Sequence, residues 1–121
     1  MKKATWKKKI TDACRDVGTY RESFDSVIDT LASILERRDD LQERYEQSGG
    51  NPIVTHTNKG GATNLEQNPY LRLINDLNRD ALAYWRDLGL TPAGLKRIDE
   101  NRMKAQENKK SFEDVLSSLG I

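Results

Sequence analysis

Residues 57–92 constrain the fold of this chain more than any other stretch, because three backbone signals follow one another there. A polar, glycine-rich loop comes first. Asn68 can then cap a helix whose first position, Pro69, has no N–H group to leave unpaired. Gly89 can adopt the left-handed conformation that ends this helix, and Thr91-Pro92 can start another almost at once. The stretch therefore predicts a loop, a helix, a tight turn and a second helix.

Apolar residues at helical spacing predict further helices before this stretch. Residues 1–18 are expected to form a basic N-terminal helix or arm, and residues 20–47 a long helix. Residues 48–68 have no helical pattern and are expected to form a loop or a short β-hairpin. Residues 69–103 then form a helix-turn-helix-like pair, which completes the helical core. The predicted fold class is all-α.

The C-terminal residues 104–121 are predicted to form a linker and a docking helix. Residues 104–110 are polar, which indicates a frayed end or linker, and Ser111 can cap a short helix after them. The apolar side chains of that helix share one side: Phe112, Val115, Leu116 and Leu119. A helix of this kind commonly docks on a partner, and it could equally fold back onto its own domain.

A narrow apolar stripe runs along the long helix at alternating spacings of four and three residues. This spacing suits packing between helices, either within one chain or between subunits, and an intrachain hairpin is at least as well supported. Arg38 interrupts the stripe and needs a carboxylate partner if it is buried. If the stripe joins subunits, the oligomerisation residues are Phe24, Val27, Leu31, Ile34, Leu41 and Tyr45.

Charge is spread unevenly, although the net charge is only +1. Residues 1–15 carry six basic side chains and one acidic, a net of +5. Residues 16–57 carry four basic and nine acidic, a net of −5, and residues 58–121 carry a net of +1. Lysines at a helix N-terminus oppose the helix dipole, so the basic start of the chain indicates an anionic partner. A lysine-rich end that only keeps the protein soluble explains it equally well.

Patterns typical of catalysis or metal binding are missing from the sequence. Cys14 and His56 are the only cysteine and histidine and lie far apart, so no nucleophile–base set or metal cluster is available. Lys59 precedes the loop glycines, whereas a phosphate-binding loop needs the lysine after them. No apolar run approaches the length of a membrane span. We therefore expect a cytoplasmic binding or assembly protein, with no enzymatic activity and no cofactor or metal.

Three motifs, in their order and spacing, resemble the phage terminase small subunits: Thr57-Asn58-Lys59-Gly60-Gly61-Ala62, Asn68-Pro69 and Leu88-Gly89-Leu90-Thr91-Pro92. The resemblance extends to Trp6 and Asp12-Ala13-Cys14 near the N-terminus and to Leu31-Ala32 in the long helix. It implies a mainly helical, non-catalytic subunit of a ring-shaped homo-oligomer. Such a ring recognises the packaging site of double-stranded viral DNA in the host cytoplasm. It then hands the DNA to the large terminase subunit, which holds the ATPase and nuclease. Residues 111–121 are expected to dock that large subunit or a neighbouring protomer.

Two sets of basic residues are candidates for the DNA contact. In the leading hypothesis the N-terminal region and the central loop contact DNA, through Lys3, Lys7, Lys8, Lys9, Arg15 and Lys59. In the alternative, the predicted helix-turn-helix presents Lys96, Arg97 and Arg102. A protein of a different class also fits this sequence: a helical adaptor or scaffold that binds only protein, in which the lysines serve solubility.

Overall fold

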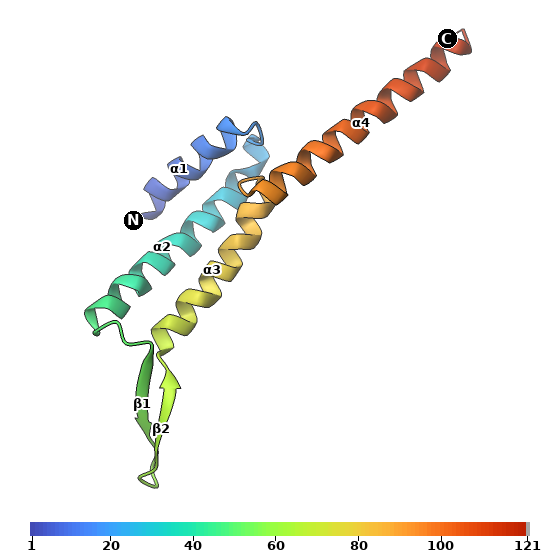
Figure 1. Cartoon of the computed structure of the whole chain (residues 1–121). Coiled ribbons are helices and arrows are strands. Elements are labelled where there is room, and N and C mark those ends of the chain that lie inside the picture. The colour runs from blue at the N-terminus through green and yellow to red at the C-terminus, as the bar shows by residue number, and fades with distance from the viewer. Residues whose placement is uncertain (121) are drawn as a thin grey trace.

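The computed structural model describes residues 1–120 of the 121-residue chain, and Ile121, the last residue of the predicted docking helix, lies outside the described residues. The structure is mainly helical, as predicted, with one β-hairpin in its middle (Figure 1). The elements, in chain order, are α1 (Lys3–Asp16), the short 3-10 helix η1 (Glu22–Phe24), α2 (Asp25–Gln47), β1 (Ile53–Thr57), β2 (Thr63–Gln67), α3 (Pro69–Asp87) and α4 (Pro92–Ser118).

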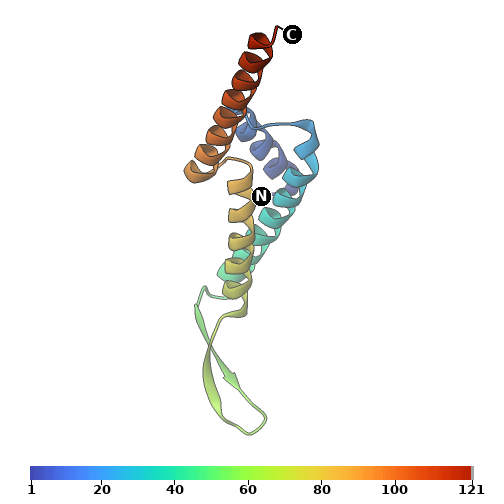
Figure 2. The same cartoon turned by 90° about the vertical axis from the view of Figure 1, so that its right-hand side faces the viewer.

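Helices α1, α2 and α3 form the body of the molecule. Helix α2 packs against α1 on one side and α3 on another, and α2 and α3 run in opposite directions. The hairpin extends from one end of this body and α4 from the other, so the far end of α4 is remote from the N-terminus (Figures 1 and 2). None of the helices in residues 1–120 is long and apolar enough to cross a membrane.

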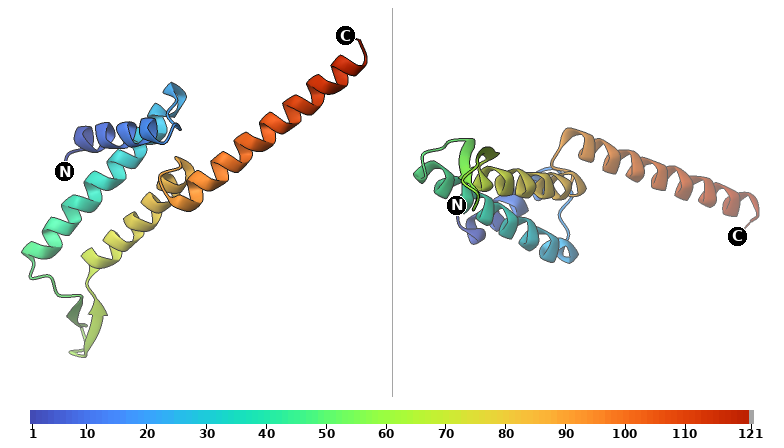
Figure 3. Two further views of the ribbon diagram at one scale, coloured as in Figure 1. Left: turned by 45° about the horizontal axis from the view of Figure 1, so that its top comes forward. Right: turned by 90° about the horizontal axis from the view of Figure 1, so that it is seen from below.

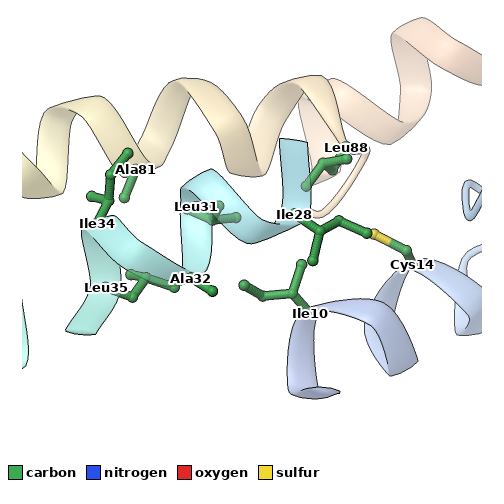
Figure 4. Packing of buried hydrophobic residues seen from close by; sticks show 9 residues of the cluster. All are labelled: Ile10, Cys14, Ile28, Leu31, Ala32, Ile34, Leu35, Ala81 and Leu88. Atoms are coloured by element: carbon green, nitrogen blue, oxygen red, sulfur yellow. The ribbon is translucent and has the colours of Figure 1, made fainter. Parts of the chain in front are cut away.

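The core is small and is centred on α2 (Figure 4). Most of the buried side chains of the core come from α2. This helix has two adjoining apolar stripes, one packed against α1 and the other against α3. The buried apolar residues of this cluster are Ile10, Cys14, Ile28, Leu31, Ala32, Ile34, Leu35, Ala81 and Leu88. The single stripe read from the sequence therefore omitted Ile28, Ala32 and Leu35.

Leu31 and Ile34, which were candidates for an intersubunit seam, are buried inside the subunit. Their exposed fractions are 0% and 8%, and Ile34 lies beside Ala81 of α3 (Figure 4). The intrachain hairpin is thus the arrangement that the structure adopts at these two positions. Phe24 is more open, with 36% exposed, whereas Val27 is half-buried against the core.

Both capping signals around α3 act as predicted. The Asn68 side-chain oxygen accepts a hydrogen bond from the backbone N–H of Tyr70 at 3.0 Å. The Thr91 hydroxyl accepts one from the backbone N–H of Gly94, also at 3.0 Å. Gly89, between the two helices, has a positive φ of 73°. Local backbone chemistry therefore sets the start of α3, its end and the restart at Pro92.

The prediction of a linker over residues 104–110 is wrong, because α4 runs without a break from Pro92 to Ser118. The segment is polar, but it contains no glycine or proline, and its Lys, Ala, Gln and Glu residues are good helix formers. Ser111 therefore caps no new helix. Helix α4 also leads outward from the end of α3 instead of folding across it, so the pair is not arranged as a helix-turn-helix (Figures 1 and 3).

Residues 48–68 adopt the hairpin alternative. The two strands pair antiparallel from Ile53 opposite Gln67 to Thr57 opposite Thr63. At the turn, the side-chain oxygen of Asn58 accepts hydrogen bonds from the backbone N–H groups of Gly60 and Ala62, at 2.9 and 3.0 Å. The hairpin is exposed almost throughout, so its local turn chemistry and strand pairing hold it together.

Candidate functional site

The basic N-terminal segment is a packed helix and not a free arm. Ile10 and Cys14 of α1 are fully buried in the core, and burial raises the pKa of the Cys14 thiol. Trp6 packs against the same core and meets Trp85 of α3 edge to face, with ring centroids 6.4 Å apart. The basic residues of α1 are therefore presented from a fixed helix.

Two of the candidate lysines on α1 are paired with carboxylates of α2. Lys3 Nζ lies 3.0 Å from Asp29, and Lys7 Nζ lies 3.2 Å from Asp25 and 3.6 Å from Asp29. The hydrogen bond to Asp25 raises the pKa of Lys7, and the hydrogen bond from Lys3 lowers the pKa of Asp29. Charges of the basic first segment thus face charges of the acidic second segment inside one subunit.

Helix α2 also supplies the negative charge that the N-terminus of α1 lacks. The first turn of α1 contains no acidic residue, and no side chain caps it from Lys2. Instead, a carboxylate oxygen of Glu36 accepts a hydrogen bond from the backbone N–H of Lys3 at 2.6 Å. An anion at this position compensates the helix dipole, which explains how a lysine-rich helix start is stable without an external ligand.

Trp6 is the centre of a cluster that joins α1 to α2. Its indole N–H donates to Asp39 at 2.7 Å, and Asp39 also pairs with Arg38 at 3.0 Å. The guanidinium of Arg38 lies 5.5 Å from the Trp6 ring centroid, and Lys9 Nζ lies 5.4 Å from it. Burial favours a higher pKa for Asp39, but the hydrogen bonds from Trp6 and Arg38 hold that pKa below its ordinary value. Arg38 therefore has the carboxylate partner that its place in the stripe requires.

Three cations of α1 remain directed toward solvent. Lys8, Lys9 and Arg15 are exposed, and none of them joins an ion pair in residues 1–120. Lys8 and Arg15 are seven residues apart on the side of α1 opposite the buried Ile10. Arg15 lies over Tyr20, with its guanidinium carbon 4.6 Å from the ring centroid. These three are the members of the leading set that can meet an anion without first breaking an intramolecular pair.

The alternative set on α4 is divided. Arg102 donates from Nη2 to the carbonyl oxygen of Gly18 at 2.7 Å and lies 3.8 Å from Asp99, so it is engaged within the subunit. Lys96 and Arg97 are exposed in the first turns of α4. Lys59 lies apart from both sets, in the turn of the hairpin, at the end of the body opposite α4 (Figure 1).

The root of α4 is tightly packed against the body. A Cβ on Gly94 would collide with the backbone carbonyl of Arg86, so only glycine allows this approach of α4 to α3. At Gly89, the side chains of Ile98 and Thr19 lie 2.9 and 3.0 Å from where a Cβ would stand. These contacts, together with the hydrogen bond from Arg102 to Gly18, set the direction in which α4 leaves the body.

Among the apolar surfaces that stay open in residues 1–120, two can serve contacts between proteins. One is a groove of about 380 Å³ between α2 and α3, whose floor is Leu41, Leu73 and Leu77 and whose rim includes charged residues. The other is the far end of α4, where residues 99–115 are exposed on every side. Its exposed apolar side chains are Phe112, Val115 and Leu119, with Leu116 partly covered.

Sequence reasoning missed the acidic partners on α2 and the α2–α3 groove. The adjacency of a segment of charge +5 and one of charge −5 was the signal that could have suggested intramolecular pairing. The groove had no comparable signal, because Leu41 and Leu73 come from helices that are far apart along the chain.

The family model described as phage terminase, small subunit, matches residues 3–105. No curated protein and no solved structure matches the chain. The matched region contains α1 to α3, the hairpin and the first half of α4, and it ends before the apolar stripe at the far end of α4.

Proposed function

Because this chain belongs to the phage terminase small-subunit family, we propose that it recognises the packaging site of a viral genome and delivers that DNA to the large terminase subunit. In this proposal it acts as a homo-oligomeric ring on double-stranded DNA in the host cytoplasm. The ATPase and nuclease activities belong to the large subunit. The observation that carries the proposal is the family match, which includes the whole body and the hairpin.

The DNA contact is proposed on the outer side of α1, through Lys8, Lys9 and Arg15. These residues are exposed and join no ion pair in residues 1–120, whereas Lys3 and Lys7 would have to exchange Asp25 and Asp29 for phosphates. Each lysine that neutralises a phosphate releases counterions, so affinity falls steeply with salt. Repetition around a ring multiplies such weak contacts. Contacts of this kind position DNA, and sequence preference would come from DNA shape or from a few base contacts.

The fixed position of α1 favours DNA binding by a helix surface, and not by a flexible N-terminal arm. A helix docked through Trp6, Ile10 and Cys14 presents its outer cations at constant spacing, which lowers the ordering cost of binding. Lys59 in the hairpin turn is a separate candidate, because it lies at the far end of the body. Phe24, Val27, Leu41 and Tyr45 remain candidates for subunit contacts.

A salt series tests the DNA surface. Fluorescence anisotropy with a labelled DNA duplex is measured for the wild type, for Lys8→Glu/Lys9→Glu and for Lys96→Glu/Arg97→Glu, each at several salt concentrations. Loss of two phosphate contacts on α1 should weaken binding and reduce the slope of log K against log salt by about 2. Lys59→Glu is measured beside them. The α1 surface is excluded if the Lys8/Lys9 variant binds as the wild type does.

The other two hypotheses predict different patterns in the same experiment. If the exposed cations of α4 carry the contact, the Lys96/Arg97 variant loses binding and the Lys8/Lys9 variant keeps it. If the chain is an adaptor that binds only protein, the wild type shows no salt-dependent DNA binding at all. A native mass measured by light scattering accompanies the series, because a wild type that stays monomeric contradicts the proposed ring.

A further inference from the structure

We propose that the far end of α4 docks into the α2–α3 groove of a second copy of this chain, so that neighbouring subunits join head to tail. This inference rests on the proposed function, since it names the contact that would build the homo-oligomer. Its two halves are the apolar stripe Phe112, Leu116 and Leu119 and the groove floor Leu41, Leu73 and Leu77.

The stripe continues a surface of α4 that already packs in the subunit. Positions along α4 alternate in spacings of three and four, and Leu95, Ile98 and Arg102 at its start contact the body. The same line continues as Ala105, Lys109, Phe112, Leu116 and Leu119. A helix that uses one side for packing near its root, and exposes the same side as apolar residues farther out, is expected to pack there against another body.

The stripe cannot reach the groove of its own subunit. Leu73 and Leu77 lie in the half of α3 nearest the hairpin, whereas α4 leaves from the other end of α3 and leads away (Figures 1 and 2). Phe112 is about 30 Å along α4 from Pro92, at 1.5 Å per residue. The contact of Gly94 with Arg86 holds the root of α4, so folding back would require breaking the helix.

Parallel pairing of two α4 helices with each other is disfavoured by charge. In a parallel pair, equivalent positions of the stripe face each other, so Arg102 would face Arg102 and Lys109 would face Lys109. Both residues lie on the side of α4 that would form the contact, where two like charges facing each other are destabilising. A groove that offers carboxylates is a better partner for this side of α4.

The rim of the α2–α3 groove offers such carboxylates. Arg37, Asp40 and Asp76 border the leucine floor, so it offers two carboxylates and one cation. The matching part of α4 carries Lys109 and Glu113, which lie 4.0 Å apart in an exposed pair. Asp40 and Asp76 make only exposed pairs, with Arg44 and Arg79, and such pairs contribute little. These carboxylates can therefore exchange partners when Lys109 approaches.

Two substitutions and two matched controls test the contact by native mass, measured with light scattering over a range of concentrations. Leu73→Asp places a charge on the groove floor, and Phe112→Asp places one on the stripe. Leu82→Asp is the control on α3, since Leu82 is 47% exposed against 49% for Leu73 but lies outside the groove. Met103→Asp is the control on α4, since Met103 is 60% exposed against 63% for Phe112 but lies off the stripe.

The expected result is an oligomeric wild type, oligomeric controls, and a fall to the single-chain mass in both test variants, with unchanged helical circular dichroism. If the wild type is an oligomer and both test variants keep its mass, the docking contact is wrong while the proposed ring stands. If the wild type is a monomer at all concentrations, the proposed ring and the docking contact both fail.

Cross-linking gives a second, positive test. Leu73→Cys and Leu116→Cys are combined and treated with a short bismaleimide, and the native Cys14 does not interfere because it is buried. A ladder of covalent oligomers is expected from the double variant and only single chains from each single variant. Dimers from Leu116→Cys alone would mean that α4 pairs with α4, and an oligomeric double variant without a ladder would also contradict the docking.

Discussion

Arg102 donates a hydrogen bond from Nη2 to the carbonyl oxygen of Gly18 at 2.7 Å, which ties α4 to the turn that follows α1. Gly18 and Arg102 are far apart in sequence, so this bond joins two segments that meet only in the folded structure. Arg102→Ala should lower the free energy of unfolding by about 1 kcal/mol. It should also speed hydrogen exchange in the first three turns of α4, measured by mass spectrometry. Arg97→Ala, at an exposed neighbouring position, is the control and should change neither quantity.

The approach of Gly94 to the Arg86 carbonyl predicts a strong effect of one methyl group. Gly94→Ala forces α4 away from α3 and should destabilise the protein by about 1–3 kcal/mol, as overpacking does. Urea denaturation followed by circular dichroism measures it. Gly60→Ala is the control, since a Cβ there meets only the Asn58 side chain, at 3.4 Å. Equal stability of the Gly94 and Gly60 variants would contradict the tight junction.

The lowered pKa of Asp39 predicts a dependence of stability on pH. A carboxyl whose pKa is lower in the folded state stabilises the fold above its unfolded pKa, near 3.9, and loses that contribution as the pH falls through the folded pKa. Asp39→Asn should therefore cost about 1–2 kcal/mol at neutral pH and progressively less below about pH 4. Urea midpoints across this range measure it, with Asp12→Asn on the outer side of α1 as control. If the wild type and Asp39→Asn differed in unfolding free energy by the same amount at every pH, the ionised Asp39 carboxylate would not be the source of the stabilisation.

The burial of Leu31 predicts that the apolar stripe of α2 stabilises the fold of the single subunit. Leu31→Ala removes a fully buried side chain and should cost about 2–5 kcal/mol. Phe24→Ala, at a position that is 36% exposed, should cost clearly less. Thermal or urea denaturation at low protein concentration separates the two, because assembly then contributes least. If Phe24→Ala lost more stability than Leu31→Ala, the apolar stripe of α2 would instead belong to a subunit interface.

Helix boundaries around α3 could be predicted because their causes are local. Asn68 and Thr91 cap through hydrogen bonds to residues two and three positions away, and Gly89 supplies a backbone conformation that side chains disfavour. The prediction of a linker over residues 104–110 failed because polarity alone does not exclude a helix. A helix needs good helix formers and no breaker, and this segment satisfies both conditions without an apolar side.

The candidate site was predicted only in outline. The lysines of α1 were identified, but the sequence alone could not show that Lys3 and Lys7 face Asp25 and Asp29 while Lys8 does not. That division depends on the rotation of α1 about its own axis, which is set by the burial of Ile10 and Cys14. The double stripe on α2 was missed for a similar reason, since periodicity shows one packing side well and two adjoining sides poorly.

The glycine at the root of α4 bears on how subunit number can change in evolution. A head-to-tail contact closes into a ring only when the rotation from one subunit to the next divides a full turn, and otherwise it winds into an open filament. If α4 makes that contact, its tilt at Gly94 sets this rotation. A small change in the residues around Arg86 would then alter the copy number, or open the ring, without touching the surfaces that meet.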